Sequence, residues 1–548
     1  MALTEGRSPI ERSLAARVSV TEEPRAWWRD AVIYEVAAIS FQDSNGDGYG
    51  DLPGLLQRID YLKWLGVGAV WLTPVYKSPD QDFGYDISDF SAIDARYGTM
   101  DDFDRVKEAL HEAGIKLVLD FVPNHTSDRH VWFHESRVSR DNPKADWYVW
   151  AEAGANGGPP NNWLSRFGGS GWEWCESRRQ FYYHSFLPSQ PDLNWRNEQV
   201  RRAMAGVLRL WLDRGVDGFR VDASAVLIKD DLLRDNPADP EAGDSTPPPQ
   251  RYTPVFTDDR PEAMGCIEYI RSILDEYDAR LLCGEVQGKT DRIGHFYGND
   301  KPRLHLPLNF ALLDTEWNAI ALQATIDAYF NAIPDGGWPN FVIGGHDKRR
   351  VATKLGQAQA RILAMLLMTI RGTPIIFAGD EIGSQQVKIP PEKIRDPFEK
   401  FVKGFGLNRD PERAPLRWDA TERGGFTTGD PWLPLSEDRS CSIETARRDE
   451  RSLLHLYREL IALRGCEPCL LRGEYLPMRA HNDIFSFARV LDQVQILVGL
   501  NLCREPRLWE WRGNGIRLMT SYLDREQAKL VGPTHLRPNE GLVIKLNR

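Results

Sequence analysis

The amino-acid sequence predicts an α/β fold: a TIM-type (β/α)8 barrel with an inserted loop-rich domain after its third strand and a C-terminal antiparallel β domain. Three observations support this prediction. Short β-branched and apolar runs alternate with amphipathic helical patterns, which is typical of parallel βαβ units. Eight such runs occur, and eight strands favour a closed barrel over an open sheet. At 548 residues, the chain exceeds the usual size of one compact domain.

The first half of the barrel follows the alternation closely. Strand candidates at 31–38, 68–73 and 115–121 are separated by helical patterns at 53–65 and 101–114. After Phe121 the alternation stops, and a stretch rich in Trp, Gly, Pro and Asn continues to Asp192. Helical periodicity then returns at 198–215. This pattern indicates a small domain inserted between the third strand and its helix.

The second half supplies five more strand candidates and then a change of pattern. These strands are expected at 217–223, 280–286, 304–310, 340–347 and 374–379. Alternating runs near the C-terminus predict an antiparallel sheet. The expected organisation is an N-terminal extension (1–26), the barrel (27–123 and 193–469), the inserted domain (124–192) and the C-terminal β domain (470–548). Two loop-rich segments, 235–260 and 384–435, are expected at the barrel mouth.

Composition excludes several functional classes. A net charge of −11 and a pI near 5.6 argue against nucleic acid and anionic membranes as partners. No apolar run of about 18 residues is present that could span a bilayer. The N-terminus lacks the apolar core of a secretion signal, so a cytoplasmic location with reduced cysteines is expected. A small neutral substrate fits best, and the protein is expected to be a monomer or a homodimer.

Charged residues fall at the ends of the predicted strands, where barrel enzymes place their catalytic groups. Asp120 ends the third strand candidate, and Arg220 and Asp222 lie on the fourth. Glu285 lies on the fifth, and Asp347 follows the seventh. Any one of these carboxylates could be a capping or surface group, but their joint placement predicts one active site.

At these positions the sequence resembles the α-amylase superfamily of glycoside hydrolases, in particular its α-glucosidase and oligo-1,6-glucosidase branch. The resemblance extends over nearly the whole chain from Trp27. The matching segments are DFVPNHTS (120–127), GFRVD (218–222), GEV (284–286) and GGHD (344–347). Further matches are GYDISDF (84–90), QPDLN (190–194), GTPIIFAGDEIG (372–383) and RDPERAP (409–415). Several motifs in the same order are far more specific than one.

The resemblance implies catalytic roles for three acids. Asp222 would be the nucleophile, Glu285 the general acid/base and Asp347 the third carboxylate, which binds sugar hydroxyls and favours the distorted transition state. A retaining glycosidase needs such a pair of carboxyl groups, one to attack the anomeric carbon and one to protonate the leaving oxygen. Arg220 lies two residues before Asp222, on the same strand face, and can hold that carboxylate ionised.

The resemblance also implies substrate-binding residues. His125 and His346 would bind sugar hydroxyls, and Tyr85 and Phe167 would offer stacking surfaces. An acid–base pair would close the pocket behind a terminal glucose in exo-acting members. Asp86 and Arg413 are the expected pair, and Arg409 is the competing partner for the acid.

The segment DSNGDGYGD (43–51) has oxygen-bearing side chains at alternate positions and glycines that permit a sharp turn. It resembles the start of a calcium loop, although Gly54 stands where an EF-hand would have its closing Glu. The family carries a structural Ca2+ or Mg2+ loop at this place. The implied ligands are Asp43, Asn45, Asp47, the Tyr49 carbonyl and Asp51.

The expected function is a retaining, exo-acting α-glucosidase that acts on short oligosaccharides, with some transglucosylation. The alternative is trehalose synthase or another sucrose- or maltose-type transglucosidase. The non-enzyme alternative is an inactive sugar-binding or transport-associated relative. Two departures from the branch bear on specificity: Gly345 replaces the usual Asn, and Ala223 stands where a bulky Val accompanies α-1,6 cleavage. Ala223 therefore favours α-1,4 bonds or sucrose.

Overall fold

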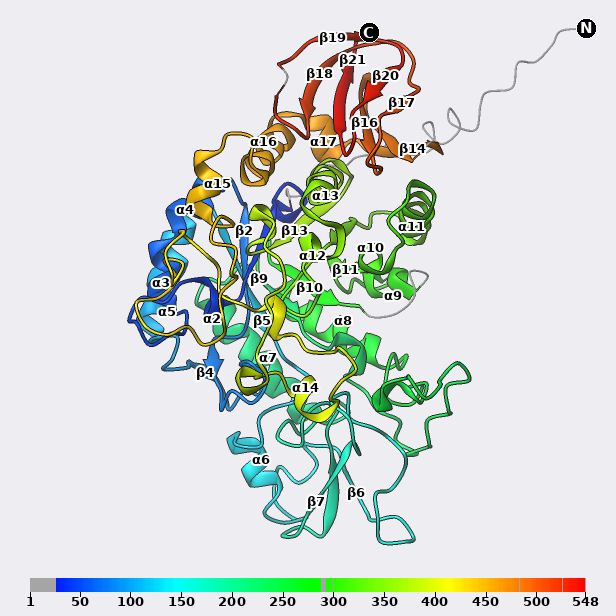
Figure 1. Cartoon of the computed structure of the whole chain (residues 1–548). Coiled ribbons are helices and arrows are strands. Elements are labelled where there is room, and N and C mark those ends of the chain that lie inside the picture. The colour runs from blue at the N-terminus through cyan, green and yellow to red at the C-terminus, as the bar shows by residue number, and fades with distance from the viewer. Residues whose placement is uncertain (1–25, 287–291, 299, 482, 525, 548) are drawn as a thin grey trace, which may run out of the picture.

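The computed structural model describes residues 26–286, 292–298, 300–481, 483–524 and 526–547. The expected extension at 1–26 lies almost wholly outside them. A central barrel carries a small lobe at one end and a β-sheet domain at the other (Figure 1). No helix in the described ranges has the length and apolar character needed to cross a bilayer.

Eight parallel strands form the nearly closed barrel, as predicted. Their spatial order is β11-β10-β9-β5-β2-β1-β13-β12. The ring is completed near β11 and β12, where the Val342 N–H donates to the Asn309 carbonyl at 3.0 Å. The barrel strands are β1 (Ile33–Val36), β2 (Ala69–Leu72), β5 (Lys116–Phe121), β9 (Gly218–Val221), β10 (Leu281–Glu285), β11 (Leu306–Leu308), β12 (Asn340–Val342) and β13 (Thr373–Phe377).

The barrel interior is filled by side chains from alternate positions of its strands. Because successive strand residues point to opposite faces, every second residue enters the barrel. Trp28 and Trp338 pack against the same cluster. The strand residues of this cluster are Ile33, Ala69, Trp71, Val118, Leu281, Cys283, Leu306, Leu308, Val342 and Ile375. The interior is thus a packed core, and chemistry is confined to its rim.

Helices cover the outside of the barrel, and local sequence signals set where several of them begin. Thr99 and Asp102 form a capping box at the start of α5, and Asn197 caps α7. Gly66 ends α4 in the left-handed conformation that glycine adopts easily. The principal covering helices are α3 (Leu52–Gln57), α4 (Ile59–Leu65), α5 (Met100–Glu112), α7 (Glu198–Asp213), α8 (Ala263–Leu274), α11 (Ala319–Ala332), α13 (Gln357–Thr369) and α16 (Leu453–Cys466).

Shorter helices belong mostly to the connecting loops and the inserted lobe. One of them, α14, matters below because it lies in the loop after β13. They are α2 (Ala38–Phe41), α6 (Val131–Ser136), α9 (Ile293–Tyr297), α10 (Ala311–Asp314), α12 (Val351–Leu355), α14 (Pro397–Phe401), α15 (Ile443–Arg448) and α17 (Pro468–Arg472).

The lobe between β5 and α7 contains a three-stranded antiparallel sheet, in the order β6-β8-β7. Trp163, Trp172 and Tyr183 pack together in its small core. A two-stranded sheet of β3 and β4 follows β2 in the chain. The strands are β3 (Tyr76–Lys77), β4 (Asp89–Ile93), β6 (Trp150–Ala151), β7 (Trp172–Cys175) and β8 (Gln180–Tyr183).

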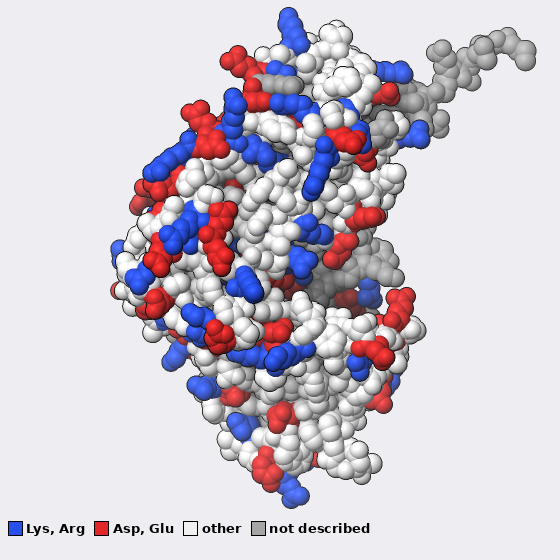
Figure 2. Space-filling view, in the orientation of Figure 1, with Lys and Arg blue, Asp and Glu red and all other residues white. Residues whose placement is uncertain are grey.

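The C-terminal domain is antiparallel, as predicted. Its six-stranded sheet has the order β14-β15-β16-β21-β18-β19, and β17 pairs with β20 beside it. The strands are β14 (Glu474–His481), β15 (Ile484–Leu491), β16 (Val494–Asn501), β17 (Arg507–Trp509), β18 (Asn514–Thr520), β19 (Lys529–Val531), β20 (Thr534–Leu536) and β21 (Gly541–Leu546). On the face shown in Figure 2, acidic and basic side chains are interspersed.

Candidate active site

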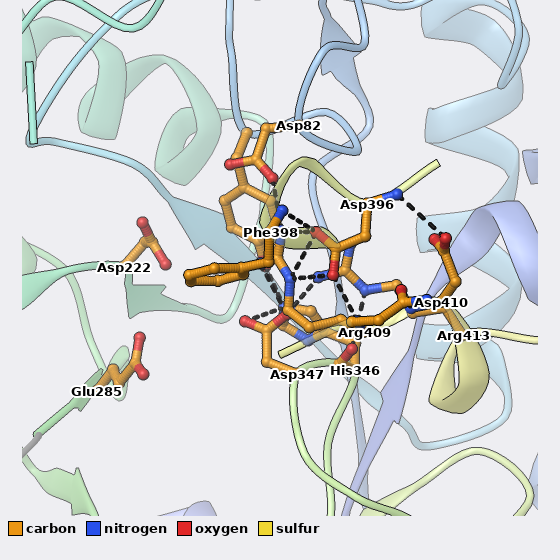
Figure 3. A network of polar contacts seen from close by, with 12 residues as sticks. Asp82, Asp222, Glu285, His346, Asp347, Asp396, Phe398, Arg409, Asp410 and Arg413 are labelled. Atoms are coloured by element: carbon orange, nitrogen blue, oxygen red, sulfur yellow. Dashed lines mark hydrogen bonds and ion pairs between the residues drawn. The ribbon is translucent and has the colours of Figure 1, made fainter. Parts of the chain in front are cut away.

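Three predicted acids gather at the carboxyl ends of the barrel strands. Asp222 directly follows β9, Glu285 ends β10, and Asp347 lies beyond β12. Parallel strands bring these ends to one edge of the barrel. Figure 3 shows Asp222 and Glu285 approaching each other from neighbouring strands, with Asp347 on the other side among arginines. The structure therefore brings the predicted catalytic residues together.

Arg220 holds the first two acids. Its Nη1 lies 2.6 Å from Asp222 Oδ1, and its Nη2 lies 3.0 Å from Glu285 Oε2. Nη1 also contacts Asp120 Oδ1 at 3.1 Å. The Arg220 side chain is only 3% exposed, whereas those of Asp222 and Glu285 are each 13% exposed. One buried guanidinium thus fixes two carboxylates whose outer atoms remain accessible.

The electrostatic environment favours a proton on the Asp222–Glu285 pair. Burial and, after it, the negative charges of Glu285, Asp120 and Asp347 together raise the pKa of Asp222 to about 7, against the opposing effect of Arg220. Neighbouring carboxyl groups that interact this strongly titrate as a pair. Near neutral pH the pair can therefore supply one acid and one carboxylate, which is the combination that acid-assisted displacement needs.

Asp347 lies in the opposite environment. Arg409 Nη1 contacts Asp347 Oδ1 at 3.2 Å, and Arg413 Nη2 bonds the same oxygen. His346 Nε2 lies 3.3 Å from Asp347 Oδ2. Burial opposes ionisation, but His346, Arg409 and Arg413 together hold the pKa of Asp347 well below its usual range. This carboxylate is therefore charged at neutral pH.

Tyr85 connects the two sides of the site. Its hydroxyl donates to Asp120 Oδ2 at 2.9 Å and lies 2.9 Å from His346 Nε2. Its ring stacks on that of His346 with a centroid distance of 5.6 Å. Tyr85 is 7% exposed, so most of its side chain packs against protein.

His125 and Phe167 come from the inserted lobe and line the same region. His125 is buried, and its Nε2 lies 3.1 Å from Gln190 Nε2 and 3.2 Å from the Tyr85 carbonyl. Burial lowers the pKa of His125, so the ring is neutral at neutral pH. Phe167 packs edge-on against Phe398 of α14 at 4.5 Å. The lobe and the loop after β13 therefore meet at an aromatic contact.

The expected pair of Asp86 with Arg413 does not form. Asp86 is fully buried and accepts hydrogen bonds from the Ser78 hydroxyl and the backbone N–H groups of Gln81 and Asp82. Arg413 instead donates to the His346 carbonyl at 2.8 Å and bonds Asp347. The buried carboxylate of Asp86 thus stabilises its own loop, with a pKa that burial raises to about 6.

Arg409, the competing partner, pairs with other acids than Asp86. Its Nη2 lies 3.0 Å from Asp82 Oδ1 and 2.9 Å from Asp396 Oδ1. Its guanidinium also lies over the rings of Phe398 and Phe167, at 4.9 and 5.4 Å. Figure 3 shows Asp82, Asp396 and Asp347 around this one side chain. Arg409 thus links the loop after β3, the loop after β13 and the third carboxylate.

The predicted metal loop forms a series of tight Asx turns. Asp43 Oδ1 accepts from the N–H groups of Asn45 and Gly46. Asn45 and Asp47 accept in the same way from the residues two positions on. Asp51 caps α3 through the Gly54 N–H at 2.6 Å. Among the described residues, no three His, Cys, Asp or Glu side chains converge as a metal-binding group.

Sequence reasoning left three contributors without a role. Asp82 lies four residues before Asp86 in the same loop, and the family resemblance pointed to Asp86 alone. Asp396 and Phe398 come from the loop-rich segment after β13, which has no periodic pattern to place it. Their common signal is proximity to Arg409, and only the folded chain reveals that proximity.

Comparisons with known proteins agree with this geometry. The alpha-amylase catalytic-domain family matches residues 35–473. A probable alpha-glucosidase of Rhizobium meliloti (strain 1021) is 39% identical over 89% of this chain and 91% of its own length. An oligo-1,6-glucosidase of Parageobacillus thermoglucosidasius is 36% identical over 95% of this chain and 99% of its own.

Solved structures give the same family and add transfer enzymes. The alpha-glucosyl transfer enzyme XgtA is 36% identical with a TM-score of 0.90, covering 95% of this chain and all of its own. The trehalulose synthase MutB from Pseudomonas mesoacidophila MX-45 is 32% identical with a TM-score of 0.86, covering 96% of this chain and all of its own. The chain belongs to the alpha-amylase family of glycoside hydrolases.

Proposed function

We propose that this enzyme is a retaining, exo-acting α-glucosidase that removes terminal α-linked glucose from short oligosaccharides or from sucrose. The observation that carries the proposal is the Asp222–Arg220–Glu285 arrangement. Two carboxyl groups on neighbouring strands are fixed by the two ends of one buried guanidinium. Their environment keeps a proton on the pair near neutral pH.

The proposed reaction has two steps. Asp222 attacks the anomeric carbon while Glu285 gives its proton to the departing oxygen, which leaves a glucosyl ester on Asp222. Glu285, now a carboxylate, removes a proton from water, and the resulting hydroxide oxygen displaces Asp222. Asp347 remains negative throughout and accepts hydrogen bonds from sugar hydroxyls, which become stronger as the ring approaches the planar, positively charged transition state.

Exo action follows from the closed end of the site. Arg409 joins Asp82, Asp396 and Asp347 on the side of Asp347 away from Asp222 (Figure 3). We infer that this cluster, in which Arg409 ties two loops to the third carboxylate, would block a further sugar beyond a glucose bound against it. We therefore propose that Asp82 and Arg409, in place of Asp86 and Arg413, define the non-reducing end.

Transglucosylation is the second candidate. It uses the same glucosyl ester and differs only in whether water or a sugar hydroxyl displaces Asp222. The likeness to XgtA, an alpha-glucosyl transfer enzyme, favours it. Likeness to MutB, which has been solved with its substrate sucrose, favours a small disaccharide as donor. Trehalose synthesis belongs to the same set of outcomes.

The residue after the nucleophile supports a linkage preference. Ala223 has φ +49° and ψ +37°, the left-handed conformation. A β-branched residue is strained in this conformation, so the backbone also favours a small side chain at position 223. Next to it, the Ser224 hydroxyl bonds the Glu285 carbonyl and ties this turn to β10. We propose that α-1,4 bonds or sucrose are preferred over isomaltose.

We also propose that the 43–51 loop binds Ca2+, or Mg2+ in its place. The donor chemistry supports this, because side-chain and carbonyl oxygens recur at alternate positions around Gly46 and Gly48, both with positive φ. Asp43, Asn45, Asp47, the Tyr49 carbonyl and Asp51 would hold the ion. Chelation should lower the melting temperature and re-addition of Ca2+ should restore it. An unchanged melting temperature with no bound metal by elemental analysis would exclude the site.

Product analysis tests the proposed function. The enzyme is incubated separately with maltose, sucrose, trehalose and isomaltose, and the products are separated by chromatography. Complete conversion of maltose to glucose, or of sucrose to equal amounts of glucose and fructose, supports hydrolysis. New di- or trisaccharides, with less glucose than hydrolysis would give, support transfer as the main reaction. Absence of turnover on all four substrates, together with maltose-length early products from starch, would contradict an exo-α-glucosidase.

A further inference from the structure

We propose that Glu35 is a positioning residue of the active site: its carboxylate holds the His346 ring in place as a cation, and that cation fixes Asp347. Glu35 belongs to β1 and is completely buried at the carboxyl end of the barrel. The inference rests on the proposed function, because it assigns Glu35 to the third carboxylate of that same site.

The contacts of His346 determine its protonation state. Nδ1 bonds Glu35 Oε1, and the His346 backbone N–H lies 3.3 Å from the same oxygen. Nε2 lies 2.9 Å from the Tyr85 oxygen and 3.3 Å from Asp347 Oδ2. The one hydroxyl proton of Tyr85 is directed to Asp120, so Tyr85 can only accept from His346.

Both ring nitrogens therefore face acceptors. A neutral imidazole has one N–H and could serve only one side, whereas an imidazolium donates from both nitrogens. The geometry thus requires the doubly protonated ring. Burial alone would lower the pKa of His346, but Asp347 and Glu35 together raise it to about 9. Glu35 is the acceptor at Nδ1, and Asp347 is among those at Nε2.

The second carboxylate oxygen of Glu35 indicates that the negative charge of this side chain matters. Glu35 Oε2 is buried and has no hydrogen-bond partner among the described residues. An unpaired buried acceptor costs stability. An amide oxygen could also accept from Nδ1 with less of a desolvation penalty, but it would lack the negative charge that strengthens the bond to a cationic ring. Gly345 leaves this oxygen its space, because a Cβ there would lie 3.3 Å from Oε2. The carboxylate is thus explained by the positive ring that it supports.

Other charged groups also face His346 and must be considered. Tyr85 and Asp120 approach from the barrel side, and Arg413 donates to the His346 carbonyl. Arg409 acts through Asp347. The two arginines disfavour a cationic ring, and the acids favour it. Removing the Glu35 charge should therefore lower the pKa of His346, while Asp347 still raises it.

The test compares Glu35→Gln with Glu35→Asp and a matched control, Glu381→Gln. Glu381 is an equally buried carboxylate that bonds the Tyr34 and Tyr61 hydroxyls, away from the acids of the site. The side-chain 15N resonances of His346 are identified by their loss in His346→Gln and are titrated in the free enzyme. This readout does not depend on catalysis.

The titration has a clear expected outcome. In the wild type His346 should lose its proton near pH 9. In Glu35→Gln the midpoint should fall by about one pH unit, because one opposite charge is removed. Glu35→Asp should retain most of the shift, and Glu381→Gln should leave the midpoint unchanged even if it lowers the melting temperature. A His346 that titrates at its ordinary value in the wild type, or equally in Glu35→Gln, would overturn the proposal.

Kinetics with α-glucosyl fluoride supply the second readout. Fluoride needs no proton to leave, so the alkaline limb of kcat/KM no longer reports the acid Glu285. That limb should move to lower pH by about one unit in Glu35→Gln and should not move in Glu381→Gln. An unmoved limb in Glu35→Gln contradicts the proposal. If the wild type releases no fluoride, the proposed function fails, while the titration still decides the role of Glu35.

Discussion

The two halves of the active site hold their carboxylates in opposite ways. On the β9–β10 side, one arginine serves Asp222, Glu285 and Asp120 together, and the pKa of Asp222 is raised to about 7, chiefly by burial. On the β12 side, two arginines and a histidine surround Asp347. There the pKa of the carboxylate is held well below its usual range.

The difference corresponds to two kinds of chemical work. In the proposed reaction a proton enters and leaves the Asp222–Glu285 pair, and the charge of this pair is left incompletely compensated. Asp347 must remain negative while positive charge develops on the sugar, so cations surround it before substrate arrives. The pair on one side can thus exchange a proton, whereas the carboxylate on the other side keeps its negative charge.

The largest expected effect comes from removing the proton-transferring pair. Glu285→Gln should lower kcat/KM on maltose by about 10²- to 10⁴-fold, because general acid catalysis is lost. Asp222→Ala should lose still more, since no ester can form. With α-glucosyl fluoride, Glu285→Gln should recover much of the first step, whereas Asp222→Ala should not. Near-wild-type turnover of maltose by either variant would refute the assignment.

The next effect distinguishes the two acids of the loop after β3. Asp82→Asn should lower kcat/KM on maltose by roughly 30-fold or more, because breaking a buried charge pair costs about 2 kcal/mol at least. Asp86→Asn is the matched control, because Asp86 lies in the same loop without contacting Arg409. It should affect the melting temperature more than activity. The reverse order of effects on kcat/KM would restore the pairing of Asp86 with an arginine.

Stability measurements test the electrostatic contrast directly. The Asp222 carboxyl has a raised pKa, so its stabilising contribution is present below about pH 4 and is lost as pH rises through about 7. Asp222→Asn should therefore raise the melting temperature at pH 8, on the order of a few °C, with no gain near pH 4.

Asp347 should behave in the opposite sense. Its pKa is lowered, so its contribution is present above the ordinary Asp value and is lost only as pH falls through the folded value. Asp347→Asn should therefore lower the melting temperature at pH 8. Calorimetry from pH 4 to 8 measures the melting temperatures of both variants. If both melting temperatures shift in the same direction at pH 8, the electrostatic contrast between the two sides is wrong.

The smallest effect concerns linkage preference beside the nucleophile. Ala223→Val should raise the ratio of kcat/KM for isomaltose over that for maltose, by an amount that corresponds to about 1 to 3 kcal/mol of transition-state binding. Because residue 223 has positive φ, Val also adds backbone strain, so Ala223→Gly is the control that removes strain and side chain together. An unchanged ratio in the Val variant would mean that residue 223 does not set specificity.

Much of the fold could be predicted because its signals are local. The eight barrel strands and the C-terminal sheet follow from apolar periodicity, and the acids at strand ends follow from parallel topology. Asp86 was expected from the sequence and Asp82 was passed over, because both lie in one irregular loop and the partner of Asp82, Arg409, is more than 300 residues away. Glu35 was missed for a similar reason, since within its strand it looks like one polar residue in an apolar run.

The stereochemistry of the product tests the central claim most directly. A retaining enzyme forms and breaks a bond to Asp222, so glucose released from maltose should first appear as the α-anomer. Proton NMR of the anomeric region, recorded before mutarotation, distinguishes the two anomers. Initial α-glucose from the wild type is the predicted result. Initial β-glucose would contradict the account, because it would mean that water attacks the sugar directly and that Asp222 is not a nucleophile.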